Sequence, residues 1–82
     1  MPSVTIFYFA NLRDRLGCEN EAVDLPSATT SADVLATIAR RHPACAETVA
    51  RCRLAVDQAF ADGPLTLSAT SELALIPPVS GG

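Results

Sequence analysis

Lysine is absent from this sequence of 82 residues, whose six basic residues are all arginines, against nine acidic residues and a formal net charge of −3. The arginines occur in scattered pairs with acidic residues between them, so no continuous basic stripe is present that could follow a nucleic-acid backbone. We therefore expect no nucleic-acid partner. Without lysine, one copy of the chain also cannot be conjugated to a side chain of another copy through an isopeptide bond.

The sequence also lacks long apolar runs and paired cysteines. No uninterrupted apolar stretch approaches the ~20 residues that a membrane-spanning helix needs, and no basic segment followed by an apolar run marks a signal peptide. The three cysteines, Cys18, Cys45 and Cys52, cannot all be paired, which is typical of a reducing compartment. We predict a cytoplasmic protein without a membrane partner. The thiols are interpreted as small buried groups rather than as sulfur-relay or metal-binding groups, because no tetrahedral ligand set is complete.

Size and composition indicate one small globular domain. Hydrophobic residues make up 49% of the chain and charged residues 18%. A domain of this length buries roughly 60% of the surface that its unfolded chain exposes, which leaves little room for an enclosed active site. Apolar patterning predicts an α+β arrangement in which a sheet packs on a main helix that begins after the N-cap Thr30. The predicted strands cover residues 4–10, 18–25, 54–60 and 73–76, and the predicted helices cover residues 11–16, 31–41 and 44–52.

The first strand carries apolar side chains on both of its faces. If Tyr8 points into the core, Phe7 and Phe9 point away from it, because side chains alternate along a strand. A domain this small has no second core to receive these rings. They predict an exposed apolar surface of the kind that marks an interface, unless a loop or a long side chain covers them.

The chain ends in the sequence Pro-Pro-Val-Ser-Gly-Gly. The two prolines stiffen its first part, and the glycines, which have no Cβ, can enter a narrow channel. Six extended residues reach ~20 Å. We therefore predict a flexible tail over residues 77–82 that carries the α-carboxylate of Gly82 into another protein, attached to a domain of residues 1–76. An inert, frayed end is the alternative. Activation by a nucleotide followed by attack of a sulfur nucleophile would convert such a carboxylate into a thiocarboxylate.

Three stretches together resemble the small, sulfur-carrying subunits of molybdopterin synthase, which are ubiquitin-like β-grasp sulfur carriers. The stretches are residues 4–13 with the following Leu16-Gly17, residues 54–56, and residues 76–82. The resemblance covers essentially the whole chain and implies a β-grasp fold, with a mixed sheet packed on one main helix plus short helices. Two departures are Asp57, where the family often has asparagine, and Ala69-Thr70-Ser71, where it often has an Asp-Gly-Asp turn.

The resemblance also implies a function. The catalytic group would be Gly82, which a ubiquitin-activator-like adenylyltransferase adenylates before it becomes a thiocarboxylate (1-thioglycine). The tail would enter the active site of a large subunit and give its sulfur to a cyclic pyranopterin phosphate to build the dithiolene of the molybdenum cofactor. The assembly is usually two small plus two large subunits, and no bound cofactor or metal is expected. Tail residues inserted into the partner would be Pro78, Val79, Ser80 and Gly81, and partner-binding residues would be Phe9, Phe60, Ile76, Pro77 and Arg13.

Three other functions remain open from the sequence. A sulfur carrier for the thiazole of thiamine shares the fold and the Gly-Gly end, although such carriers typically lack the Pro-Pro-Val-Ser segment. A ubiquitin-like protein modifier would use the same terminal carboxylate, and a plain interaction module would not use it at all.

Overall fold

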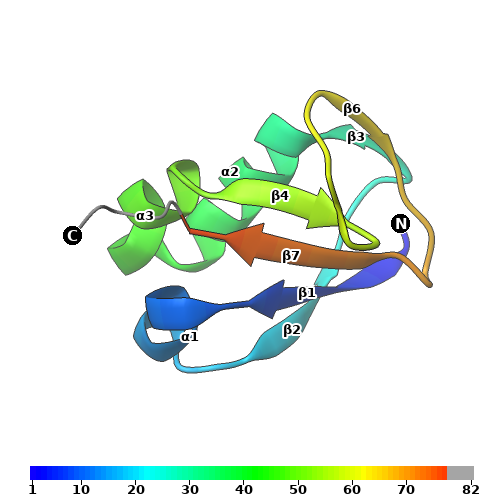
Figure 1. Cartoon of the computed structure of the whole chain (residues 1–82). Coiled ribbons are helices and arrows are strands. Elements are labelled where there is room, and N and C mark those ends of the chain that lie inside the picture. Colours follow the sequence, from blue (N-terminus) through cyan, green and yellow to red (C-terminus); the bar gives the residue numbers. More distant parts are fainter. Residues whose placement is uncertain (78–82) are drawn as a thin grey trace.

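The structure is a computed structural model that describes residues 1–77; the predicted tail residues from Pro78 to Gly82 lie outside this range. A five-stranded sheet with the strand order β2-β1-β7-β4-β5 forms its centre (Figure 1). Strands β1 and β7 are parallel and the other neighbours are antiparallel, so the sheet is mixed, as predicted. The strands are β1 (Ser3–Tyr8), β2 (Asn20–Asp24), β4 (Arg53–Val56), β5 (Ala59–Phe60) and β7 (Glu72–Ile76).

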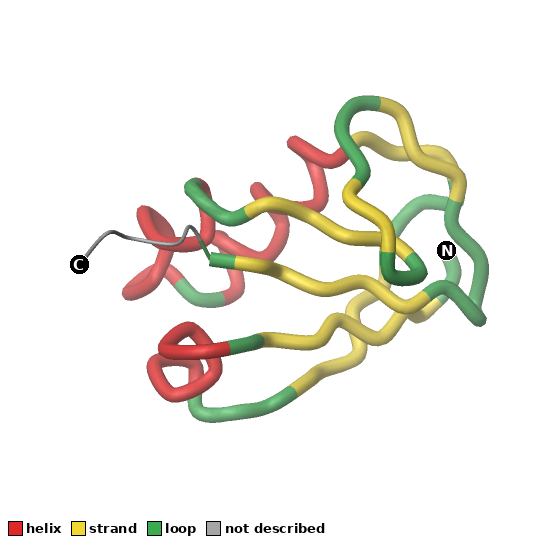
Figure 2. The backbone as a smooth tube through the Cα atoms, viewed as in Figure 1, coloured by secondary structure: helices red, strands yellow, loops and turns green. Residues whose placement is uncertain are grey.

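The helices surround one face and one end of this sheet. The main helix α2 (Ser31–Arg41) lies across one face, while α1 (Ala10–Leu16), η1 (Pro43–Cys45) and α3 (Ala46–Ala50) lie toward the end at which β1 and β7 finish (Figure 1). Strand β7 is parallel to β1, so both strands run away from the side of the domain on which the N-terminus lies (Figures 1 and 2). No helix within residues 1–77 is long and apolar enough to cross a membrane.

The bounds of α2 are those that the sequence predicts. The Thr30 hydroxyl oxygen accepts a hydrogen bond from the backbone N–H of Asp33 at 3.1 Å, which caps the first turn. The helix ends before Pro43, because the residue preceding a proline is disfavoured in the α region. Val34 and Ile38 are fully buried on its inner face.

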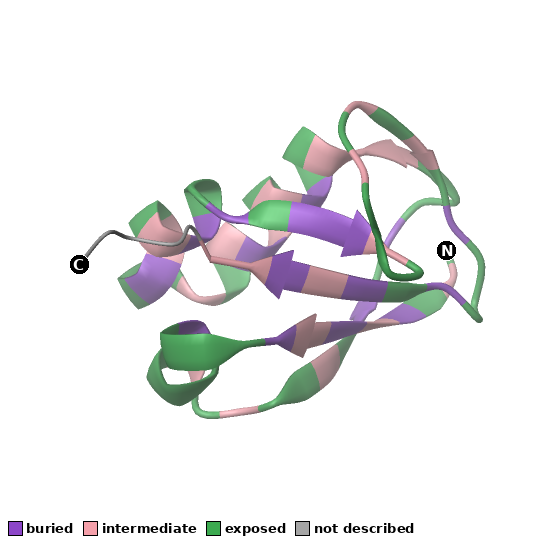
Figure 3. Ribbon diagram, in the orientation of Figure 1, coloured by how far each residue is buried: buried purple, intermediate pink, exposed green. Residues whose placement is uncertain are grey.

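The core lies between α2 and the inner face of the sheet. Alternate residues of β1 and β7 enter it, and α1 and α3 contribute one fully buried side chain each, whereas in β4 the consecutive residues Leu54 and Ala55 are both buried (Figure 3). Two of the cysteines, Cys45 and Cys52, are buried and Cys18 is partly buried. The main core residues are Val4, Ile6, Tyr8, Leu12, Val23, Val34, Ile38, Val49, Leu54, Leu73 and Leu75.

A second, two-stranded sheet pairs β3 (Ala28–Thr30) with β6 (Pro64–Thr66). Neither strand is predicted from the sequence. Strands of three residues are too short to show an alternating pattern. Their pairing depends on contacts between distant segments: the Ser31 N–H donates to the Gly63 carbonyl, and the Gly63 N–H donates to the Ser31 hydroxyl, both at 2.9 Å. Gly63 has a φ of +81°, a conformation that glycine adopts without strain.

The turn between β4 and β5 explains one departure from the family pattern. Asp57 and Gln58 have φ values of +49° and +73°, in the left-handed region. Asparagine and aspartate are the non-glycine residues that tolerate this region best. Asp57 also accepts a hydrogen bond from the Glu72 N–H through Oδ1 at 2.9 Å, and its own N–H donates to the Glu72 carbonyl at 2.8 Å. Aspartate therefore serves this turn as asparagine would.

Glu21 connects β2 to β1 and to the end of α2. Its Oε2 accepts a hydrogen bond from the Tyr8 hydroxyl at 2.5 Å and lies 2.6 Å from His42 Nε2, while its Oε1 accepts two hydrogen bonds from Arg41. Partial burial raises the pKa of Glu21, but the hydrogen bonds from Tyr8, His42 and Arg41 outweigh it, so the pKa lies below its ordinary value. The ionised carboxylate therefore stabilises the folded state.

Replacing Glu21 with glutamine is expected to lower the free energy of unfolding at pH 7 by about 1–3 kcal/mol, because hydrogen bonds to a charged group are lost. A carboxyl whose folded-state pKa is depressed stabilises the fold above its unfolded-state pKa, and loses this contribution as the pH falls through the folded-state value. The difference between Glu21→Gln and the parent should therefore shrink below pH 4.5. Urea denaturation at pH 7 and in the acid range measures the free energy of unfolding of both proteins. A difference between them that does not depend on pH would contradict the stabilising role of the ionised Glu21 carboxylate.

Candidate functional site: the uncovered face of the sheet

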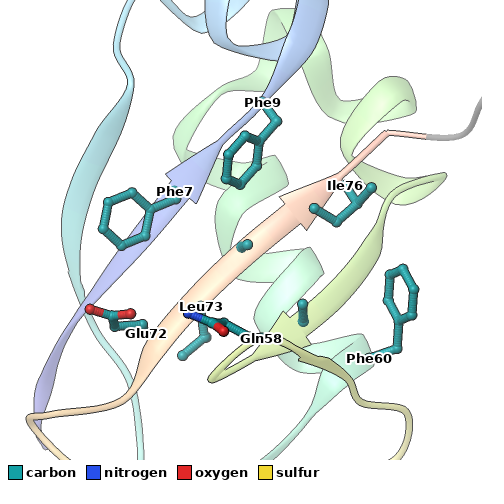
Figure 4. A pocket seen from close by; sticks show the side chains of 9 residues that line it. Phe7, Phe9, Gln58, Phe60, Glu72, Leu73 and Ile76 are labelled. Atoms are coloured by element: carbon teal, nitrogen blue, oxygen red, sulfur yellow. The ribbon is translucent and has the colours of Figure 1, made fainter.

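The face of the sheet opposite α2 carries an apolar groove with a volume of about 430 Å³ (Figure 4). One wall comes from β1 and the segment that follows it, the other from β5, and β7 runs along the middle. The residues that line it are Phe7, Phe9, Ala55, Gln58, Phe60, Glu72, Leu73, Ala74 and Ile76.

Strand register explains why this face is hollow. Phe7 pairs with Ala74, Ala74 pairs with Ala55, and Ala55 pairs with Phe60, so one row across four strands reads large, small, small, large. Directly paired side chains lie side by side on one face of a sheet. The two alanines therefore form the floor of the groove and the two rings form its walls.

The rings around the groove remain accessible. Phe9 is 47% exposed and Phe60 is 56% exposed, although large apolar side chains are usually buried. No loop within residues 1–77 covers them, so the predicted outward orientation of these side chains is confirmed. The structure brings Phe9, Phe60 and Ile76 to one groove, and their role in binding a partner stays a prediction.

The other predicted site residues have different positions. Pro77 follows Ile76 directly and is partly buried. Arg13 lies on α1, outside the groove lining, where its guanidinium makes two long ion pairs at the exposed surface, with Asp14 at 4.0 Å and Glu19 at 3.9 Å. Gly82 and the other four predicted tail residues lie outside the described range.

Gln58 and Glu72 also line the groove, although no binding role is predicted for them from the sequence, and Phe7 is predicted to be exposed without being among the predicted partner-binding residues. Alternation along β1 is sufficient to place Phe7 beside Phe9 on the open face. Gln58 and Glu72 carry no comparable signal, because they reach the groove through the turn after β4 and the start of β7.

The described residues show no self-sufficient catalytic centre. Burial raises the pKa of the Cys52 thiol, and burial together with the Glu21 charge raises the pKa of Cys18, which disfavours the nucleophilic thiolate at neutral pH. No group of three potential metal ligands occurs within residues 1–77. The main feature of the described surface is the open apolar groove, which includes Ile76 at the end of β7.

A mixed sheet on one main helix, with an open apolar face beside the C-terminal segment, defines a ubiquitin-like β-grasp domain. The sequence profile of the ThiS family matches residues 6–82, and the chain belongs to this family. A molybdopterin synthase sulfur carrier subunit from Mycosarcoma maydis is 38% identical, with 99% of this chain and 95% of that protein covered. The protein of the same name from Caenorhabditis elegans is 33% identical, and the match covers 100% of both chains.

Solved structures confirm the β-grasp fold. The putative molybdopterin converting factor subunit 1 from Pyrococcus furiosus superimposes with a TM-score of 0.80 at 24% identity, covering 96% of this chain and all of that one. SAMP1 from Haloferax volcanii gives a TM-score of 0.78 at 28% identity, covering 98% and 99%. A complex of subunits 1 and 2 of molybdopterin-converting factor from Helicobacter pylori contains a chain that matches at 0.68 and 21% identity, again covering 98% and 99%.

Proposed function

We propose that this protein is the sulfur carrier of a molybdopterin synthase. The observation that carries the proposal is its similarity, along almost the whole length of both chains, to sulfur carrier subunits of that enzyme. The matched range extends to the terminal Gly81-Gly82. The names of these relatives do not favour the alternative function, a sulfur carrier for the thiazole of thiamine.

In the proposed reaction, the α-carboxylate of Gly82 attacks the α-phosphate of ATP in an adenylyltransferase, which releases pyrophosphate and leaves a glycyl adenylate. The terminal sulfur of a persulfide then displaces AMP to form an acyl disulfide, and a thiol reduces its S–S bond to release the thiocarboxylate. The anionic sulfur attacks a carbon of a cyclic pyranopterin phosphate in the large subunit and displaces an oxygen from that carbon, which leaves a thioester between Gly82 and the pterin. Water then hydrolyses the acyl–sulfur bond, so the sulfur stays on the pterin and the Gly82 carboxylate is regenerated. Covalent carriage divides a difficult sulfur transfer into easier steps. The chain acts as a carrier within the enzyme, and the acid–base groups belong to its partners.

The apolar groove is the surface on which we expect the large subunit to dock. Aromatic side chains that are exposed in the monomer are typical anchors of protein interfaces. The groove also adjoins Ile76, from which the chain continues through Pro77 toward the reactive end. Docking there would direct the tail toward the partner.

Intact mass spectrometry tests the proposed chemistry. The protein is incubated with the adenylyltransferase from the same organism, ATP, a persulfide donor and a thiol reductant. The expected result is a mass gain that corresponds to one oxygen replaced by sulfur, mapped to Gly82 by fragmentation. A mass that never changes, or sulfur that maps to Cys18, Cys45 or Cys52, would contradict the proposal.

Replacing Phe60 with glutamate is expected to weaken binding to the large subunit by about 30-fold or more, because a central aromatic anchor becomes a charge that must be desolvated. Phe60 is 56% exposed, so the monomer should remain folded. Isothermal titration measures the affinity. Ala36→Glu is the matched control, since it adds the same charge at an exposed position of α2. Unchanged affinity in both Phe60→Glu and Phe9→Glu would exclude the groove as the docking surface.

A second function is supported by the likeness to SAMP1, a small archaeal modifier protein that is 28% identical to this chain. A modifier would transfer the adenylated Gly82 to lysines of other proteins. The same mass experiment, run with cell extract in place of the sulfur donor, distinguishes the two: higher-mass conjugates that retain Gly82 support the modifier, and their absence alongside the thiocarboxylate supports the carrier.

A further inference from the structure

Arg53, the first residue of β4, lies at the corner of the groove from which the chain leaves β7. Its register partner is Ile76, the last residue of β7. Arg53 shares one face of β4 with Ala55, and Ala55 lies opposite Phe60. The Arg53 guanidinium therefore reaches diagonally toward β5, where its central carbon Cζ lies 3.9 Å from the centre of the Phe60 ring.

Among the residues that the structure describes, the guanidinium of Arg53 makes little use of its hydrogen-bonding capacity. Within residues 1–77, its contact with an acidic group is a long ion pair, 3.8 Å from Nη2 to Asp62 Oδ2, between side chains that are 55% and 83% exposed. Such a pair is weak, because water screens it. Arg41, by contrast, donates two hydrogen bonds to Glu21, at 3.2 and 2.9 Å. Arg53 thus presents free donors at the edge of an apolar surface.

The stacking of Arg53 on Phe60 also affects the Phe60 ring. A planar guanidinium over an aromatic face restricts the orientation of that ring through a cation–π contact. A side chain that is already ordered loses less conformational entropy when a partner binds. Arg53 is therefore placed to prepare the groove wall for docking as well as to meet the partner itself.

We propose that Arg53 is a recognition residue of the docking surface, which holds the Phe60 ring in place and receives a carboxylate of the large subunit at the rim of the groove. The inference rests on the proposed docking of that subunit on the groove. Three observations favour a carboxylate: the positive charge, the unused planar donors, and the continuity of the stacked pair with the groove lining. A guanidinium binds a carboxylate through two parallel hydrogen bonds, and docking would remove the water that now screens it.

The test compares affinities for the large subunit from the same organism at several salt concentrations. Arg53→Gln should weaken binding about tenfold at low salt and flatten the salt dependence, since a charge pair across the interface is lost. Arg53→Lys should keep the salt dependence of the parent while recovering only part of the affinity, because an ammonium group neither stacks flat nor binds through two donors. Thermal unfolding of each variant should match the parent, since Arg53 is exposed.

The matched control is Arg40→Gln, which removes the same charge from an exposed position of α2, on the other face of the sheet. It should bind like the parent. The inference is overturned if Arg53→Gln binds as tightly as Arg40→Gln, or if its loss of affinity is the same at every salt concentration. Phe60→Glu separates the two levels of the proposal: if Phe60→Glu weakens binding and Arg53→Gln does not, docking on the groove stands and the role of Arg53 fails. If Arg53→Gln, Phe60→Glu and Phe9→Glu all bind like the parent, the docking proposal fails as well.

Discussion

Replacing Ile38 with aspartate is expected to leave the chain unfolded at room temperature. Ile38 is fully buried on the inner face of α2, beneath the sheet. The substitution removes an apolar side chain from a close-packed core and places an unpaired carboxyl there, which costs about 5 kcal/mol or more. A domain of 82 residues has a free energy of unfolding of roughly 4–12 kcal/mol. The expected penalty is therefore comparable with the whole stability.

Circular dichroism and thermal denaturation measure this effect, with Val34→Asp as a second variant at a fully buried position. Ala36→Asp is the control, because it introduces the same charge on the exposed side of the same helix and should change the free energy of unfolding by less than about 1 kcal/mol. If Ile38→Asp melted at the temperature of the parent, α2 would not be the helix that covers the core.

Elements with local signals are predicted well from the sequence. The N-cap Thr30 and the helix-breaking Pro43 define α2 through contacts with their immediate neighbours, so its bounds match. The predicted helix over residues 11–16 matches α1 closely, and Gly17, with a φ of +80°, ends it in the left-handed conformation that a C-cap glycine adopts. The predicted helix over residues 44–52 is less accurate: the structure divides this region into η1 and the short α3.

Features that depend on distant segments could not be predicted. The hydrogen bonds that hold β3 beside β6 join Ser31 to Gly63 across 32 residues. The Glu21 carboxylate contacts partners from two other segments of the chain, Tyr8 on β1 and the adjacent Arg41 and His42 at the end of α2. Neither arrangement leaves a periodic pattern in the sequence, because each depends on how the completed fold brings the segments together.

The candidate site likewise combines features that can be predicted from the sequence with features that cannot. Alternation along β1 is sufficient to turn Phe7 and Phe9 away from the core, so an exposed apolar surface follows from the sequence. The groove itself requires the register that aligns Phe7, Ala74, Ala55 and Phe60 in one row. Nothing in the sequence of β4 alone shows that its alanine, Ala55, will pair with an alanine of β7. The stacking of Arg53 on Phe60 depends on this register as well.

Deleting Gly82 is expected to abolish sulfur transfer while leaving the fold and the docking intact. The deletion moves the free α-carboxylate back by one residue, ~3.5 Å along an extended chain, so it no longer reaches the reacting groups of the partners. A displacement of even ~1 Å can cost about 100-fold in rate when reacting groups must be aligned. The shortened chain keeps every residue of the described domain and of the apolar groove. Its thermal unfolding and its affinity for the large subunit should therefore resemble those of the parent.

The measurement is dithiolene formation from the cyclic pyranopterin phosphate with the purified large subunit, the adenylyltransferase, ATP, a persulfide donor and a thiol reductant. The deletion variant should give no product, and when added to the parent it should act as a competitive inhibitor, because it occupies the docking surface without delivering sulfur. Gly81→Phe should dock and fail in the same way, since its ring cannot follow the glycines through a narrow channel. Ala36→Glu, on the exposed side of α2, should support product formation at the parent rate. Dithiolene formed by the deletion variant would show that the sulfur is not carried on Gly82, and the carrier function proposed for this chain would be wrong.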